Sequence, residues 1–389
     1  MEYTPKLTEM DVMDQARDVL GKHIPLEAHG YVCTGADLWH AKRLLGVSVK
    51  QSTIHGVCQS LEDAPSDATV RGFLNEQLTI EKLDAIEKQM NAALASQIPK
   101  RVFKRPRDSA MDYHEQAYYG KTAQAEGLWI RAEAKDGTTH FYRVATAYVI
   151  WRTMRVTLVI RFVLPEEDGV SIVSDVLKSL KGLKYKVKTL FLDRGFAGVR
   201  IMRFLTKTRL RAVIACTIRG KRGGTRALCV GGASYTTRYT FRSPDQGQFT
   251  AHLAVCRVFT TARRTGRHKR HTDWMIFIMI HCSYSPQLVR QVYRRRFGIE
   301  SSYRCARSTR GWTTSPNPVI RFVLIALSFF LLNVWVRLRW LYAQIRRRGA
   351  RGVDYAHFRL DRLINWIMLA LNAIYKPVTT IAPLVEPIE

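Results

Sequence analysis

The order of apolar segments between residues 108 and 218 most constrains how this 389-residue chain can fold. Three segments alternate or are continuously apolar and β-branched, which is typical of strands, at 109–120, 140–151 and 155–165. After them, helical and strand patterns alternate at 171–183, 186–193, 198–207 and 211–218. The acids at 166–168 fall between a strand and a helix and are interpreted as a turn. This order predicts an α/β domain in which helices pack on a sheet.

The residues before this domain are predicted to form a separate helical segment and a basic linker. Apolar residues recur every three or four positions at 36–45, 53–61, 68–78 and 80–94, so residues 1–100 are predicted to be helical. Short helices joined by tight turns suit a DNA-binding domain. A helical bundle that does not contact DNA is the alternative. The basic segment at 99–107 is predicted to be a linker that also contacts phosphate.

We therefore divide the chain into four segments. Residues 1–100 are a helical DNA-binding domain, and residues 101–216 are the first part of the α/β core. Residues 217–285, with glycine-rich turns and short strands, are a β-rich insertion. Residues 286–389 are the remainder of the core and the C-terminal helices.

The charge of the chain points to a polyanionic partner. Lysine and arginine number 61 against 32 acids, a net charge of +29. The excess is spread along the chain, which favours nucleic acid over a membrane surface. The apolar segment 322–336 has only 15 residues, fewer than the roughly 18–20 that a membrane span needs, and predicts a core helix packed against a sheet.

Other features narrow the class of protein. Seven scattered cysteines form no Cys-x-x-Cys pair, which suits a reducing cytoplasm, and the polar start predicts no signal peptide. No phosphate-binding loop of the Gly-x4-Gly-Lys-Ser/Thr type is present, so ATP is not implied.

Two motifs carry chemistry. Asp193 ends an apolar strand pattern, at the place where α/β sheets position their active sites. In the segment YRRRFGIESSYRCAR, Tyr293, Arg296, Glu300 and Arg307 lie at offsets of 0, 3, 7 and 14, which one helix would place within about 60° of each other. A carboxylate among cations suits a site for metal and phosphate. A solvated basic helix is the alternative.

The second motif resembles the Tyr-x2-Arg-x3-Glu-x6-Lys signature of DDE transposases from prokaryotic insertion sequences. The segment SAMDYHEQAYYGK, with Asp112, is similar to the first catalytic strand of that family, and TLFLDRGFAG, with Asp193, to the second. The chain departs from the signature at Arg307, where the family usually has lysine. The resemblance implies an RNase H-like catalytic core with a β-rich insertion before the glutamate.

The resemblance also implies the roles of the site residues. Asp112, Asp193 and Glu300 would hold two Mg²⁺ or Mn²⁺ ions and would be catalytic. Tyr293 and Arg296 would contact DNA, and either Arg307 or Arg304, on the same helix face, would bind phosphate near the scissile bond.

The function implied is transposition. The protein would bind the terminal inverted repeats of its element in double-stranded DNA, cleave the strands and join them to target DNA as a homodimer. Such an enzyme would act in the prokaryotic cytoplasm, associated with the nucleoid. A related nuclease that only hydrolyses DNA, and a catalytically dead DNA-binding derivative, are the alternatives.

Overall fold

The chain divides into two compact units. The computed structural model describes residues 6–23, 45–62, 66–121, 128–151, 154–264, 267–345 and 352–380. Unit 1 comprises residues 1–98, 117–142 and 302–389, and unit 2 comprises residues 99–116 and 143–301. The N-terminal helices thus share a unit with the C-terminal helices, a grouping that the sequence alone did not suggest.

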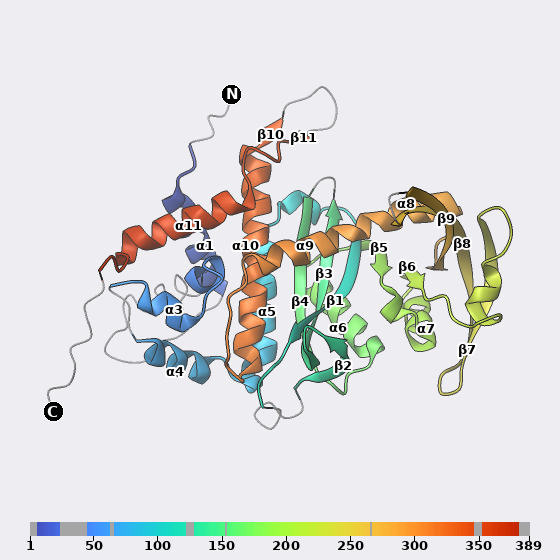
Figure 1. Cartoon of the computed structure of the whole chain (residues 1–389), viewed down its shortest axis with the longest axis horizontal. Helices are drawn as coiled ribbons and strands as arrows, with labels where there is room; N and C mark the ends of the chain where they lie inside the picture. The colour runs from blue at the N-terminus through green and yellow to red at the C-terminus, as the bar shows by residue number, and fades with distance from the viewer. Residues whose placement is uncertain are drawn as a thin grey trace. The chain divides into compact units, whose positions relative to one another are not determined.

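Unit 1 is mainly helical (Figure 1). Its principal helices are α1 (Glu9–His23), α3 (Ile54–Gln59), α4 (Asp67–Gln77), α5 (Leu83–Ser96), α10 (Pro318–Tyr342) and α11 (Leu360–Tyr375). The helices predicted at 53–61, 68–78 and 80–94 are confirmed, whereas α1 lies outside the predicted segments. The side chain of Ser66 caps α4 by accepting a hydrogen bond from the Thr69 backbone N–H. The helix predicted at 36–45 falls on residues of which only Leu45 is described.

Helix α10 is the most apolar element of unit 1. The Asn317 side chain caps its start by accepting hydrogen bonds from two backbone N–H groups, and Pro318 occupies the first turn. Among the described residues, α10 is the one helix long and apolar enough to cross a membrane, and 94% of its most apolar window is buried. Asn333, 1% exposed, donates a hydrogen bond to the Leu94 carbonyl of α5 at 3.2 Å. The prediction of a core helix is confirmed, but within unit 1 it packs on α5, α11 and the short strand β10 (Gln344–Ile345), not on a large sheet.

Unit 2 is built on a large mixed sheet. The sheet order is β2 (Ile130–Lys135), β3 (Thr138–Trp151), β1 (Arg107–Ala117), β5 (Val187–Leu192), β6 (Arg211–Cys216), β9 (Arg267–Ile280), β8 (Gly247–Arg264) and β7 (Tyr235–Ser243), while β4 (Met154–Val163) pairs with β3. Strand β2 and the first residues of β3 belong to unit 1. Strand β5 is parallel to both β1 and β6, and β9 is antiparallel to β6. Every strand predicted between 109 and 218 is confirmed, and β2 is an addition.

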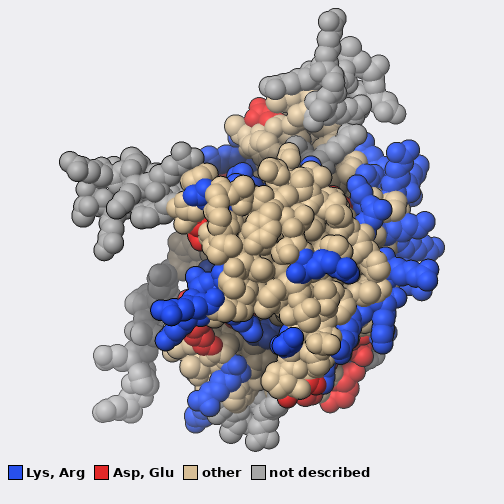
Figure 2. All heavy atoms as spheres, turned by 90° about the vertical axis from the view of Figure 1, so that its right-hand side faces the viewer, with Lys and Arg blue, Asp and Glu red and all other residues tan. Residues whose placement is uncertain are grey.

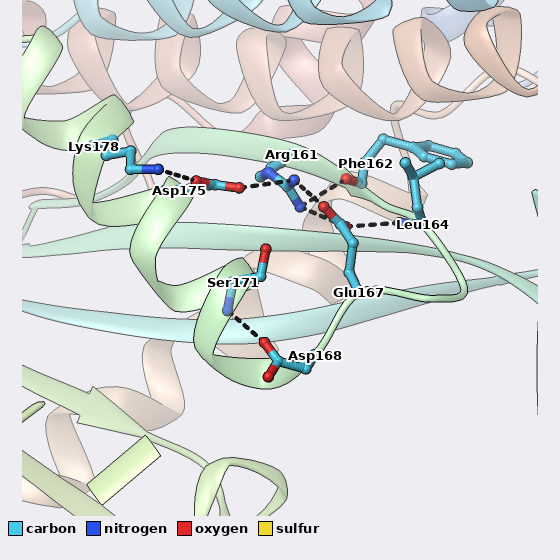
Figure 3. Close-up of polar contacts among 8 residues, drawn as sticks. All are labelled: Arg161, Phe162, Leu164, Glu167, Asp168, Ser171, Asp175 and Lys178. Carbon is cyan, nitrogen blue, oxygen red and sulfur yellow. Dashed lines mark hydrogen bonds and ion pairs between the residues drawn. The ribbon is translucent and has the colours of Figure 1, made fainter. Parts of the chain in front are cut away.

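Two helices, α6 (Gly169–Gly182) and α7 (Val199–Lys207), follow β4 and β5 as predicted. Figure 3 shows how α6 is fixed to β4: Arg161 forms ion pairs with Glu167 and, at 3.1 Å, with Asp175 of α6. Asp168 caps α6 by accepting a hydrogen bond from the Ser171 N–H at 2.8 Å. The acids between the strand and the helix therefore form the predicted turn and serve structure.

The segment 217–285 is rich in strands, as predicted, but β8 and β9, with 18 and 14 residues, are longer than the short strands expected. Strands β7, β8 and β9 pair antiparallel in sequence order, and β9 continues the main sheet through its pairing with β6. Figure 2 views the chain from the side of these strands, where Lys and Arg side chains gather on two sides of a broad area with few charges. The exposed cations of unit 2 include Arg238 and Arg242 of β7 and Arg200 and Arg203 of α7.

Candidate carboxylate and arginine site

Two neighbouring parallel strands bring Asp112 and Asp193 together. Met111 of β1 is paired in register with Leu192 of β5, so the residue that follows each of them extends toward the same end of the sheet. Asp112 is the next residue of β1, and Asp193 comes directly after the last residue of β5. The carboxyl ends of parallel strands are where α/β sheets place polar sites. The expectation for Asp193 from its place after an apolar run agrees with this geometry.

The third acid comes from a broken helix. Helix α8 (Pro286–Tyr293) begins at Ser285, whose side chain accepts a hydrogen bond from the Leu288 N–H. A 3₁₀ segment, η6 (Arg294–Phe297), separates α8 from α9 (Gly298–Arg307), which carries Glu300. A 3₁₀ turn holds three residues instead of 3.6, so the spacing of the motif residues differs from that of the single regular helix we expected.

The Arg296 guanidinium lies among the three acids. Its Nη2 is 2.7 Å from Asp112 Oδ2 and 3.6 Å from Asp193 Oδ1, and its Nη1 is 3.7 Å from Glu300 Oε1. The Arg296 side chain is 4% exposed, and its Nε is a buried donor with no hydrogen-bond partner among the described residues. The structure therefore brings the three predicted acids together around one cation, although two of the acids are 184 and 103 residues before it in the sequence (296 − 112 and 296 − 193).

Burial gives Asp112 an unusual protonation equilibrium. Desolvation raises the pKa of Asp112 to about 6, against an ordinary value of 3.8, although the Arg296 guanidinium acts in the opposite direction. The nearby Asp193 and Glu300 carboxylates add to the increase in the pKa. For Arg296, burial acts to lower the pKa, but the surrounding acids outweigh it and raise the pKa. The Asp112 carboxyl therefore changes its protonation state at a higher pH than an ordinary aspartate, whereas the Arg296 guanidinium stays charged.

The donor set fits a divalent cation. With all three acids ionised, three negative charges and one guanidinium leave a formal charge of −2, and carboxylate oxygens are the ligands that Mg²⁺ and Mn²⁺ prefer. The Asp193 and Glu300 side chains are 38% and 57% exposed, so both have room to change rotamer. Within the described part of the chain, no three acidic, histidine or cysteine side chains are already arranged to hold a metal ion. Arg296 holds the place toward which the carboxylates converge, so metal binding requires the guanidinium to shift.

The expected DNA contacts of Tyr293 and Arg296 do not fit this conformation. Tyr293 is 2% exposed, and its hydroxyl donates a hydrogen bond to the Leu192 carbonyl at 3.0 Å, so its ring cannot stack on an unpaired base. Its ring packs 4.8 Å from that of Phe277, centroid to centroid. Tyr293 instead anchors the end of α8 to the end of β5. Arg296 would have to leave Asp112 before it could bind a phosphate.

Arg304 and Arg307 are exposed on the last two turns of α9. Both belong to unit 1, whereas the acids belong to unit 2. Their phosphate-binding roles therefore stay predictions.

Aromatic stacking supports the acids and was missed in the sequence. The ring of Tyr113, next to Asp112, stacks on that of Phe196, three residues after Asp193, with centroids 4.5 Å apart and planes at 20°. The Arg143 guanidinium carbon lies 5.0 Å from the centroid of the Tyr113 ring. Arg143 also forms an ion pair with Glu115 at 2.6 Å. An aromatic residue within three positions of each acid was the sequence signal for this contact.

Comparison with known proteins places the fold. No protein-family profile matches the chain, and no curated protein matches it in sequence. Among solved structures, the chain is similar to the piggyBac transposase in a synaptic complex with hairpin DNA, with a TM-score of 0.50 and 9% sequence identity. The match covers 94% of this chain and 77% of that one. At this identity the likeness establishes the fold: a mixed α/β architecture similar to that of a transposase.

Proposed function

We propose that this chain is a DNA transposase with an RNase H-like catalytic core, related to the DDE enzymes of prokaryotic insertion sequences. The strand order supports the core assignment. Strands β4, β3, β1, β5 and β6 lie side by side in that order, with the antiparallel pair β3 and β4 next to β1 at one side and two parallel strands, each reached through a helix, at the other. The convergence of Asp112, Asp193 and Glu300 on one cation is the observation that carries the proposal.

In this proposal the three acids hold two Mg²⁺ or Mn²⁺ ions, which would activate the attacking oxygen and neutralise charge on the leaving oxygen. Asp112 would provide a rigid ligand because β1 is paired in register with β5, while Asp193 and Glu300 are more exposed and would adjust their rotamers. Arg296 balances the carboxylates before the metal ions bind. A DNA phosphate entering the site would compete with Asp112 for the guanidinium, as an anion with suitable geometry for a bidentate contact.

The substrate in this proposal is double-stranded DNA, both at the ends of the element and at the target. The net charge of +29 supports a polyanionic partner. In strand cleavage, water would attack the scissile phosphorus and the bond to the 3′ oxygen would break, which leaves a 3′-hydroxyl and a 5′-phosphate. In strand transfer, that 3′-hydroxyl would attack a phosphorus of the target DNA. Two ends that react together need at least two copies of the chain, so we propose a homodimer on paired ends, acting in the cytoplasm without ATP.

The test is an assay with labelled duplex DNA that carries one end of the element encoding the chain, plus a supercoiled target. A transposase should nick the end in Mg²⁺ and then produce joined products, and chelation of the metal by EDTA should abolish both. Nicking without joined products would identify a hydrolytic nuclease. End binding without nicking would identify an inactive DNA-binding derivative. Either of these two results would contradict the proposal.

A further inference from the structure

A basic pocket lies in unit 2 at the start of β1. The pocket is lined by Arg101, Lys104, Arg105, Arg107 and Trp151, and its volume is about 460 Å³. None of these lining residues is acidic. Four cations around one cavity create a positive local potential, so the electrostatics of the pocket favour an anionic ligand.

Packing on an aromatic ring builds this pocket. Trp151, at the end of β3, is 7% exposed. The Arg101 and Arg107 guanidinium carbons lie 4.9 and 5.4 Å from its ring centroid, a cation–π arrangement that restricts both side chains. Because the two guanidinium groups lie over the ring, a nucleic-acid base cannot use it as a stacking surface there. The tryptophan therefore fixes the cations and does not read bases.

The backbone around Arg107 is held in place as well. Its N–H donates a hydrogen bond to the Lys186 carbonyl at 2.9 Å, and its Nη2 reaches the Arg101 carbonyl at 3.5 Å. Its Nε is buried and has no hydrogen-bond partner among the described residues. A buried guanidinium donor without a partner is unfavourable, and an oxyanion is the acceptor that best satisfies it. Lys104 and Arg105 are exposed beside it and can close on the same anion.

We propose that this pocket binds backbone phosphates of double-stranded DNA, at a site separate from the carboxylate cluster. Arg107 is five strand residues before Asp112, which corresponds to roughly 17 Å along β1. A contact this far from the acids would hold DNA without taking part in bond cleavage. The inference rests on the proposed function for the identity of the ligand, because phosphodiester, nucleotide and free phosphate share the same oxyanion chemistry.

The experiment compares the salt dependence of DNA binding between two double variants. Lys104→Gln with Arg105→Gln removes the two exposed cations of the pocket and leaves the Trp151 packing intact. Lys181→Gln with Lys207→Gln removes two exposed cations elsewhere in unit 2 and changes the net charge equally. Binding of a labelled 20-base-pair duplex is measured by fluorescence anisotropy without divalent metal, at several salt concentrations, and the melting curve of each variant checks its fold.

The pocket variant should lower the slope of log affinity against log salt by about 1.8, or about 0.9 for each lost phosphate contact, while the control keeps the slope of the wild-type protein. Equal slopes for the two variants would overturn the assignment while leaving the proposed function intact. A wild-type protein that does not bind DNA at all would contradict the proposed function instead.

A second arm separates DNA from free phosphate as the ligand. Inorganic phosphate is titrated against the wild-type protein and the pocket variant at constant ionic strength, with the melting temperature as the readout. Millimolar phosphate should have the same small effect on the melting temperature of both proteins. Stabilisation of the wild-type protein alone, combined with unchanged DNA binding by the pocket variant, would identify a small-anion site and would overturn the DNA assignment.

Discussion

Replacement of Arg296 by glutamine should destabilise unit 2 more at high pH than at low pH. In the wild-type protein, Asp112 has a folded pKa of about 6 against 3.8 in its ordinary state. A folded pKa above the unfolded one means that this acid stabilises the fold below pH 3.8 and that the contribution is lost as the pH rises to about 6. At about 1.36 kcal/mol per pKa unit, the loss is about 3 kcal/mol.

The Arg296 guanidinium is the main influence that holds the pKa of Asp112 down, so its removal raises that pKa beyond 6. The variant should then continue to lose stability above pH 6, by up to about 1.4 kcal/mol per pH unit, after the wild-type protein has stopped losing it. Removing one partner of a buried ion pair costs about 3–5 kcal/mol, and this value is the upper limit for the stability that the variant loses at pH 8. We expect the deficit of the variant to be about 1–3 kcal/mol larger at pH 8 than at pH 5.5.

The assay is amide hydrogen exchange by mass spectrometry at both pH values, with intrinsic rates corrected, read as opening free energies of the β1 and β5 peptides. Arg143→Gln is the matched control, because Arg143 pairs with the half-buried Glu115 in the same unit. That variant should lose less than about 1 kcal/mol. An Arg296→Gln deficit that is the same at pH 5.5 and pH 8 would show that this guanidinium does not stabilise ionised Asp112.

Three further predictions follow from the site and the charge. Tyr293→Phe leaves the Leu192 carbonyl without its buried donor, so opening of the β5 peptide should become easier by about 1–3 kcal/mol, while DNA affinity in a gel-shift assay should not change; weaker binding would mean that the hydroxyl contacts DNA. Phe196→Leu removes the ring stacked on Tyr113 and should lower the unfolding free energy, measured by urea titration, by about 1 kcal/mol. DNA cleavage should also become slower, because Asp193 begins the turn that contains Phe196. Full cleavage activity would show that the stacked rings do not position Asp193. Wild-type DNA affinity, measured by anisotropy, should fall by at least about 10³ between 50 and 200 mM salt if six or more phosphates are neutralised, and a flat dependence would mean that the net charge of +29 serves another purpose.

The sequence predicted the elements of unit 2 because their signals are local. Apolar segments marked β1 and β5. Asp193 could be identified as a candidate site residue because an acid at the end of an apolar run needs a partner.

The burial of Arg296 could not be predicted in the same way. Three arginines in a row, at 294–296, are typical of an exposed helix face, and nothing local distinguishes Arg296 from its neighbours. Arg294 and Arg295 are exposed, whereas Arg296 is buried, because the 3₁₀ segment turns it toward acids on β1 and β5. The basic pocket was missed for a similar reason. The linker at 99–107 was predicted to touch phosphate, but Trp151, which holds its arginines, is distant in sequence.

If Asp112, Asp193 and Glu300 together hold the metal ions for DNA cleavage, the Glu300→Gln variant should lose that cleavage. The substitution keeps the size of the side chain and removes the charge that helps to hold metal. Cleavage of end-containing DNA in Mg²⁺ should fall by at least about 10²–10³, while a gel shift on the same preparation shows unchanged DNA binding. Glu166→Gln, at an exposed acid in the turn before α6, is the matched control and should cleave like the wild-type protein. Wild-type cleavage by the Glu300→Gln variant would contradict the assignment of Glu300 and the site built around it.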